Sequence, residues 1–347
     1  MDIKKLTLTL ASRYGVSGEE QGAAQVAADY LKKWGPVHSD ALGNLICALH
    51  PVPESGEHVM LCAHMDEIGM IVTAIEDTGF LKVAAVGGVD RRTLLASPVK
   101  VLAKEKLDGV VCSIPPHLQR GEESKKVPQM DEIAIDVGLD GETAREKIPL
   151  GTRVVVCHEG AAMGEHRISS KALDNRAGCA AVLYAAELLK DAPLSCGVSV
   201  VLSTREELSC NGAKTSAFGL SPTQAIAVDV SFAYTEDAPR HKCGELAKGP
   251  MIGVSPVLSK KLSAALTETA KKHEIPYQTE VMSGATSTDA DAITLAGAGV
   301  PCGLLSIPLR YMHTPTELID LRDVENCGRL MAAYVKDTFG VAGKAVE

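Results

Sequence analysis

Apolar runs without a polar break recur along this 347-residue chain, and they constrain its fold more than any other feature. Residues 59–63 read VMLCA and residues 302–305 read CGLL, while residues 197–202 read GVSVVL, with one small polar residue, Ser199. A strand with no polar face must be covered on both sides, which is typical of parallel sheets packed between helices. Helical patterns alternate with these runs, over 173–191, 260–274 and 320–339. The sequence therefore predicts an α/β fold with a mixed, mostly parallel sheet covered by helices.

A different sequence pattern interrupts this alternation of strands and helices. From residue 69 to 162 the chain shows short β-like runs, such as MIVTAI and KVAAVGG, separated by Gly, Pro and charged turns. The length of the chain also favours two domains. We therefore predict a larger domain built from residues 1–68 and 163–347, and an inserted β-rich domain over 69–162.

Two helix starts carry polar side chains. Ser17 is a candidate N-cap for a helix over 17–35, with acidic residues in its first turn. Asp174 lies at the start of the helix over 173–191, where it suits either a cap or a functional group.

Composition argues against several classes of function. Aromatic residues make up 3% of the chain and its net charge is −9, which disfavours binding to nucleic acid or to anionic membranes. No apolar stretch approaches the ~20 residues that span a bilayer, and the charged N-terminus does not resemble a signal peptide. The ten cysteines include no C-x-x-C pair, so we expect reduced thiols in a cytoplasmic protein. Cys62 and Cys210 are interpreted as packing residues.

The polar residues next to the apolar runs that we single out are all histidines or acids. Imidazoles and carboxylates follow the predicted strands or open a helix, at His64, Asp174, Glu206, Glu207, Asp229 and His313. Taken singly, a Glu-Glu pair is usually a solvated surface feature, and a loop histidine needs no function. In open α/β sheets, however, ligands bind outside the carboxyl ends of the strands. We therefore expect these groups to converge on one site.

Such a set suits a pair of divalent cations. Mixed imidazole and carboxylate donors favour Zn²⁺, with Co²⁺ or Mn²⁺ as alternatives, and a bridging carboxylate holds two such ions ~3.5–4 Å apart. Without cations, so many acids in one dry pocket would repel each other. Of the neighbours Glu206 and Glu207, one can bind metal while the other acts as general base. Asp66, two residues after His64, can orient that imidazole.

Five motifs lie around these residues: CAHMDEIGM at 62–70, KALDNRAG at 171–178, EELSCNGA at 206–213, AVDVSFAYTEDAP at 227–239 and RYMHTPTE at 310–317. In them, and over nearly its whole length, the chain resembles the glutamyl or deblocking aminopeptidases of the tetrahedral-particle type, a family of co-catalytic metallopeptidases. It departs from the family's usual Val-Gly-Leu-Arg-Gly after the paired glutamates, where it has Leu-Ser-Cys-Asn-Gly at 208–212.

The resemblance implies a zinc-peptidase type of fold and a specific set of ligands. His64 and Asp229 would hold one metal ion, Glu207 and His313 the other, and Asp174 would bridge the two.

The resemblance also implies roles and an assembly. Glu206 would be the general base, and Asp66 the acid that orients His64. The insert over 69–162 would be a β-barrel-like dimerisation domain, and dimers would assemble into a tetrahedral dodecamer.

We therefore expect a hydrolase: a metal-dependent aminopeptidase that removes N-terminal residues from short peptides, using water activated by two metal ions. Two alternatives remain open. A deacylase or carboxypeptidase would use the same metals on N-acyl amino acids and would not require a free α-amine. A non-catalytic scaffold would use the metals for stability alone.

Overall fold

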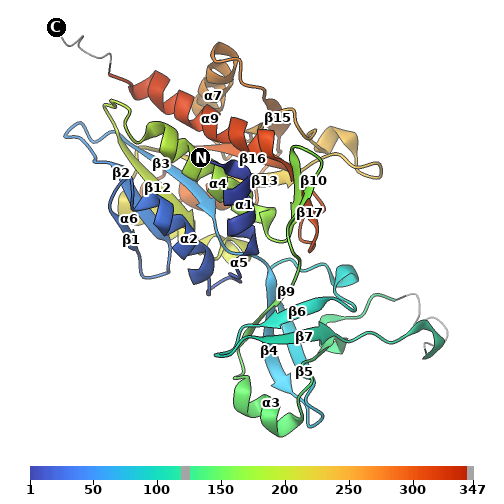
Figure 1. The fold of residues 1–347 in the computed structure, drawn as a ribbon. Coiled ribbons are helices and arrows are strands. Elements are labelled where there is room, and N and C mark those ends of the chain that lie inside the picture. Colours follow the sequence, from blue (N-terminus) through green and yellow to red (C-terminus); the bar gives the residue numbers. More distant parts are fainter. Residues whose placement is uncertain (119–125, 342–347) are drawn as a thin grey trace.

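The computed structural model describes residues 1–118 and 126–341, and it contains a larger α/β body with a smaller β-barrel attached to it (Figure 1). The predicted α/β class, with a mixed sheet between helices and an inserted barrel-like domain, is confirmed. Within the described ranges, no helix has both the length and the apolar character needed to cross a membrane.

One large sheet forms the centre of the larger body. Its strands are β1 (Val37–Ser39), β2 (Leu45–His50), β3 (His58–His64), β10 (Ala161–Met163), β11 (Arg167–Ser170), β12 (Gly197–Ser203), β13 (Gln224–Phe232), β14 (Met251–Val254), β15 (Gln278–Val281), β16 (Cys302–Arg310) and β17 (Glu317–Asp320). The main order is β1-β2-β12-β3-β13-β16-β17-β11-β10, and β14 with β15 joins through β16. The central pairs β12–β3, β3–β13 and β13–β16 are parallel.

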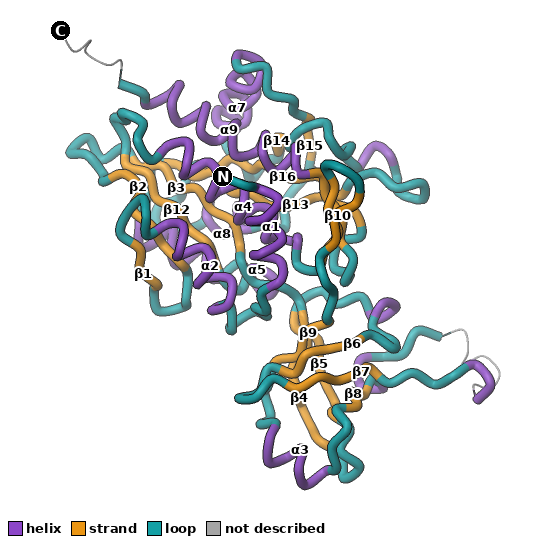
Figure 2. Tube along the Cα trace, viewed as in Figure 1, coloured by secondary structure: helices purple, strands orange, loops and turns teal. Residues whose placement is uncertain are grey.

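Helices cover both faces of this sheet (Figure 2). They are α1 (Ile3–Ser12), α2 (Gln21–Leu31), α4 (Leu173–Leu189), α5 (Glu206–Ser209), α6 (Asn211–Leu220), α7 (Lys260–Lys272), α8 (Asp289–Thr294) and α9 (Leu321–Phe339). Val59, Leu61 and Ala63 of β3 face the core formed with α1, α2, α4 and α9. Met60 and Cys62 face the core formed with α6 and α8. Both faces of β3 are thus covered, which explains why its apolar run has no polar break.

The insert is a closed barrel. Its strands are β4 (Gly69–Ile75), β5 (Leu81–Val86), β6 (Pro98–Val101), β7 (Leu107–Val111), β8 (Ala134–Asp136) and β9 (Arg153–Val156), with helix α3 (Gly141–Lys147). They close in the order β4-β5-β8-β7-β6-β9 around their own apolar core. Because β4 follows β3 after only four residues, one end of the barrel lies near the carboxyl ends of the central strands.

Two local expectations were wrong. Helix α2 begins at Gln21 rather than near Ser17, and Ser17 instead donates a hydrogen bond to Asp66 over 2.6 Å. Asp229, expected to follow a strand, lies within β13, which continues to Phe232. The pairing of β13 with β3 stops at Ala227, but its pairing with β16 holds it extended over the remaining residues.

Candidate metal centre

The acids and imidazoles singled out in the sequence lie together at the carboxyl edge of the central strands. His64 is the last residue of β3 and pairs in register with Ser203 at the end of β12. Two residues separate Ser203 from the start of α5, which opens with Glu206 and Glu207. The other three come from β13, from the first turn of α4 and from the loop after β16: Asp229, Asp174 and His313.

His64 faces three carboxylates. Its Nε2 lies 3.2 Å from Asp174 Oδ1 and 3.5 Å from Asp229 Oδ1. Glu206 Oε2 is farther away, at 3.8 Å. The His64 side chain is 1% exposed, so these contacts form away from bulk water. Burying several carboxylates around one imidazole costs free energy unless positive charge, from protons or from cations, balances their negative charge.

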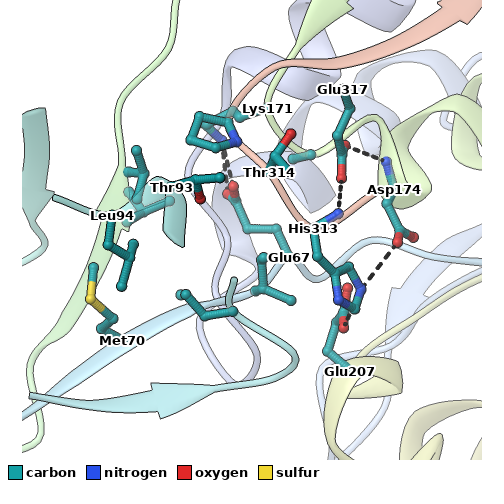
Figure 3. A pocket seen from close by; sticks show the side chains of 17 residues that line it. Glu67, Met70, Thr93, Leu94, Lys171, Asp174, Glu207, His313, Thr314 and Glu317 are labelled. Carbon is teal, nitrogen blue, oxygen red and sulfur yellow. Dashed lines mark hydrogen bonds and ion pairs between the residues drawn. The ribbon is translucent and has the colours of Figure 1, made fainter. Parts of the chain in front are cut away.

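His313 faces two carboxylates, one of which is shared with His64. Its Nε2 lies 3.4 Å from Asp174 Oδ2 and 3.3 Å from Glu207 Oε2, as Figure 3 shows. Asp174 therefore turns one oxygen to each imidazole. A carboxylate in this position is arranged as a bridge between two positive centres.

Asp66 connects His64 with the start of α5. Its Oδ1 is 3.4 Å from His64 Nδ1 and accepts the Glu206 amide over 3.0 Å. Its Oδ2 accepts the Glu207 amide over 3.2 Å and the Ser17 hydroxyl over 2.6 Å. Although burial opposes it, these contacts lower the pKa of Asp66, so the carboxylate stays charged. One side chain thus orients an imidazole and both paired glutamates.

Glu317 is a residue of this site that the sequence reasoning did not single out. It is 2% exposed, and its carboxylate accepts the His313 amide over 2.9 Å and the Asp174 amide over 3.0 Å (Figure 3). It therefore fixes the backbone of two candidate ligands at once. The available signal was its place four residues after His313, in HTPTE.

Without cations, bound protons balance the negative charge of the clustered carboxylates. Burial raises the pKa of Glu206 to about 9, and neighbouring carboxylates add to the effect. Burial lowers the pKa of His313, but Asp174 and Glu207 outweigh it and raise this pKa to about 11. The pKa of His64 likewise ends well above its usual value, despite burial. A cation that binds here must displace protons, so its affinity will rise with pH.

The residues fit a metal pair. Ligand atoms ~2.0–2.2 Å from one Zn²⁺ in tetrahedral geometry are about 3.3–3.6 Å apart. The closest contacts of His64 Nε2 and His313 Nε2 are 3.2–3.5 Å. Ligand atoms of His64, Asp174 and Glu207 lie within 4.8 Å of one another. The other ring nitrogen of His64, Nδ1, is buried and lies 3.4 Å from Asp66 Oδ1, so Nε2 is the atom left for a metal ion.

A cleft opens in front of these acids. Beside the acids it is lined by apolar side chains that include Leu208, Phe232 and Met312. Cys210 also lines it, and its thiol lies 3.6 Å from Glu206 Oε1. Cys62 is fully buried, as its interpretation as a packing residue requires, whereas Cys210 is half-buried and also faces the cleft. An apolar surface therefore lies directly beside the clustered acids.

Comparisons with known proteins agree with this geometry. The model of the M42 glutamyl aminopeptidase family matches residues 43–330. A lysyl aminopeptidase from Pyrococcus furiosus is 36% identical over 332 residues, which cover 93% of this chain and 94% of that protein. The structure of an aminopeptidase from the archaeon Desulfurococcus kamchatkensis has a TM-score of 0.90 and 35% identity, with 99% of both chains covered. The TET1 peptidase of Pyrococcus horikoshii, which can assemble into a tetrahedron or a large octahedral shell, has a TM-score of 0.83 and 31% identity, with 96% of this chain and 99% of that chain covered.

Proposed function

Because this chain belongs to the M42 glutamyl aminopeptidase family and is thus an aminopeptidase, we propose that it removes N-terminal residues from short peptides with two divalent metal ions. One observation carries the proposal: Asp174 turns one oxygen towards His64 and the other towards His313. In this assignment Asp229 completes the His64 site and Glu207 the His313 site. Zn²⁺ suits these donors best, with Co²⁺ or Mn²⁺ as alternatives.

When bound, such ions supply Lewis-acid activation of water and of the scissile carbonyl. Glu206 is the general base in this proposal. Its Oε2 lies 3.8 Å from His64 Nε2, beyond the contacts of the assigned ligands, and its side chain lines the cleft. It takes the proton of the attacking water and delivers it to the leaving amine. Asp66 positions this base through the Glu206 amide and also orients His64.

The cleft indicates how a substrate would bind in this proposal. A free α-amine would bind among the carboxylates, and the first side chain would extend along Leu208, Phe232 and Met312. An N-acylated residue lacks the positive charge that these acids favour. The free amine therefore distinguishes this function from the deacylase or carboxypeptidase alternative.

We also propose a homo-oligomer in which the barrel forms the dimer contact and dimers build a tetrahedral dodecamer. The likeness to the Pyrococcus horikoshii TET1 peptidase supports it. Light scattering on the purified protein is expected to give about 440 kDa, twelve times the chain mass of 36.5 kDa. A mass near that of one chain would contradict the proposed assembly without affecting the proposed chemistry.

The chemistry is tested with a panel of aminoacyl anilides and their N-acetylated counterparts, after reconstitution with Zn²⁺, Co²⁺ or Mn²⁺. Turnover of the free-amine substrates alone is the expected result. Turnover of the N-acetylated substrates alone would favour the N-acyl alternative. Absence of turnover with two ions bound would favour the metal-stabilised scaffold.

A further inference from the structure

The inserted barrel reaches the metal centre of its own chain. After β5, the chain turns at Gly87 and Gly88, and the Gly88 carbonyl oxygen lies 2.9 Å from His313 Nδ1. Barrel residues such as Met70 and Leu94 line the same small cavity as His313 (Figure 3). The two parts of the chain therefore meet at a candidate ligand.

This contact decides which nitrogen of His313 carries the proton. A carbonyl oxygen only accepts hydrogen bonds, so Nδ1 must donate to Gly88. In the neutral ring Nε2 then has a free lone pair, and it points at Asp174 and Glu207 over 3.4 and 3.3 Å. A second hydrogen bond that fixes the tautomer in this way is what a metal-binding histidine needs.

The turn also leaves no room for side chains. A Cβ at Gly88 would lie 2.6 Å from His313 Nδ1 and 2.8 Å from its Cε1. Gly87 has a φ of +79°, and a Cβ there would lie 3.3 Å from Glu207 Oε2. Glu317 holds the backbone amide of His313, so the ring could avoid such a Cβ only by rotating, which would break its contact with the Gly88 carbonyl oxygen.

We propose that Gly87 and Gly88 form a positioning turn, through which the barrel sets the tautomer and orientation of His313. The inference rests on the proposed metal-binding role of His313. It gives the insert a task at the active site in addition to any dimer contact. It also predicts an effect confined to the ion held by His313 and Glu207, because His64 takes its orienting contact from Asp66 instead.

The test compares Gly88→Ala with Gly138→Ala in the same barrel. Gly138 has a φ of +69° and open space around its Cβ position, so its replacement strains the backbone without touching the metal centre. Zinc content is measured by elemental analysis after dialysis against a series of chelator concentrations. We expect Gly88→Ala to hold one of its two ions about 10–100-fold more weakly, and Gly138→Ala to match the wild type within about twofold.

Two results would overturn the inference. In the first, Gly88→Ala retains both ions at wild-type affinity. In the second, it loses both ions equally and the melting temperature of its metal-free chain falls. If neither the variants nor the wild type binds two ions, the proposed two-metal function is itself wrong. If Gly88→Ala fails to fold, ¹⁵N solid-state NMR of the zinc-loaded wild type decides, with His313→Gln assigning the signal. We expect a proton on Nδ1 of His313, and a proton on Nε2 would contradict the proposal.

Discussion

Glu206→Gln should remove most of the turnover and leave both metal ions in place. The substitution keeps the size of the side chain and removes only its capacity to take a proton. Glu206 Oε2 lies 3.8 Å from His64 Nε2, against 3.3 Å between Glu207 Oε2 and His313 Nε2. General base catalysis contributes roughly 10²–10⁴ in rate. We therefore expect kcat to fall by that factor, about 3–5 kcal/mol in the barrier, with KM little changed.

Glu207→Gln is the matched control, because it makes the same chemical change one residue away. It should weaken the binding of one metal ion, and its activity should recover in part with excess Zn²⁺. Both variants are assayed by elemental analysis and by steady-state kinetics on one aminoacyl anilide. A Glu206→Gln enzyme within threefold of wild-type kcat would refute the reasoning. So would a Glu206→Gln enzyme that loses an ion as Glu207→Gln does.

Three further predictions concern stability and specificity. Asp289, the first residue of α8, is buried and accepts a hydrogen bond from Ser203 at the end of β12. Burial raises the pKa of Glu206 to about 9 and that of Asp289 to about 7, so above pH ~4.5 the folded metal-free chain holds more protons than the unfolded chain. Its melting temperature, measured by calorimetry, should therefore fall from pH 5 to pH 8, and saturating Zn²⁺ should remove this fall. A melting temperature of the metal-free chain that does not change with pH would contradict the raised pKa values of these clustered acids. Glu317→Ala leaves two backbone amides without their acceptor and should lower the free energy of unfolding by ~2–4 kcal/mol in urea titrations, whereas a change below about 0.5 kcal/mol would mean that water replaces it. Among the described residues that line the cleft there is no Lys or Arg, so leucyl anilides should exceed glutamyl anilides at least tenfold in kcat/KM, and the reverse order would contradict this interpretation of the cleft.

The fold and the gathering of the site residues were open to prediction because both follow from short-range patterns. The unbroken run Val59–Ala63 required cover on two faces, and the structure supplies it with helices on each side. Parallel strands bring their carboxyl ends to one edge, so His64 and the glutamates after β12 had to meet there.

The remaining contacts depend on pairings that no local pattern encodes. Ser17 has the sequence of a helix cap, but the tertiary structure places its hydroxyl on Asp66, 49 residues away. Gly88 looks like an ordinary turn residue until the barrel is docked against His313, 225 residues away. Glu317 lies close to His313 in the chain, yet its second partner, the Asp174 amide, comes from the start of helix α4.

The central claim is that these acids and imidazoles hold two cations, and metal stoichiometry tests it most directly. The protein is reconstituted with excess Zn²⁺, washed, and examined by elemental analysis and by anomalous diffraction at the zinc edge. We predict two ions per subunit, both in contact with Asp174. A pocket that contains no ion after this treatment would contradict the account.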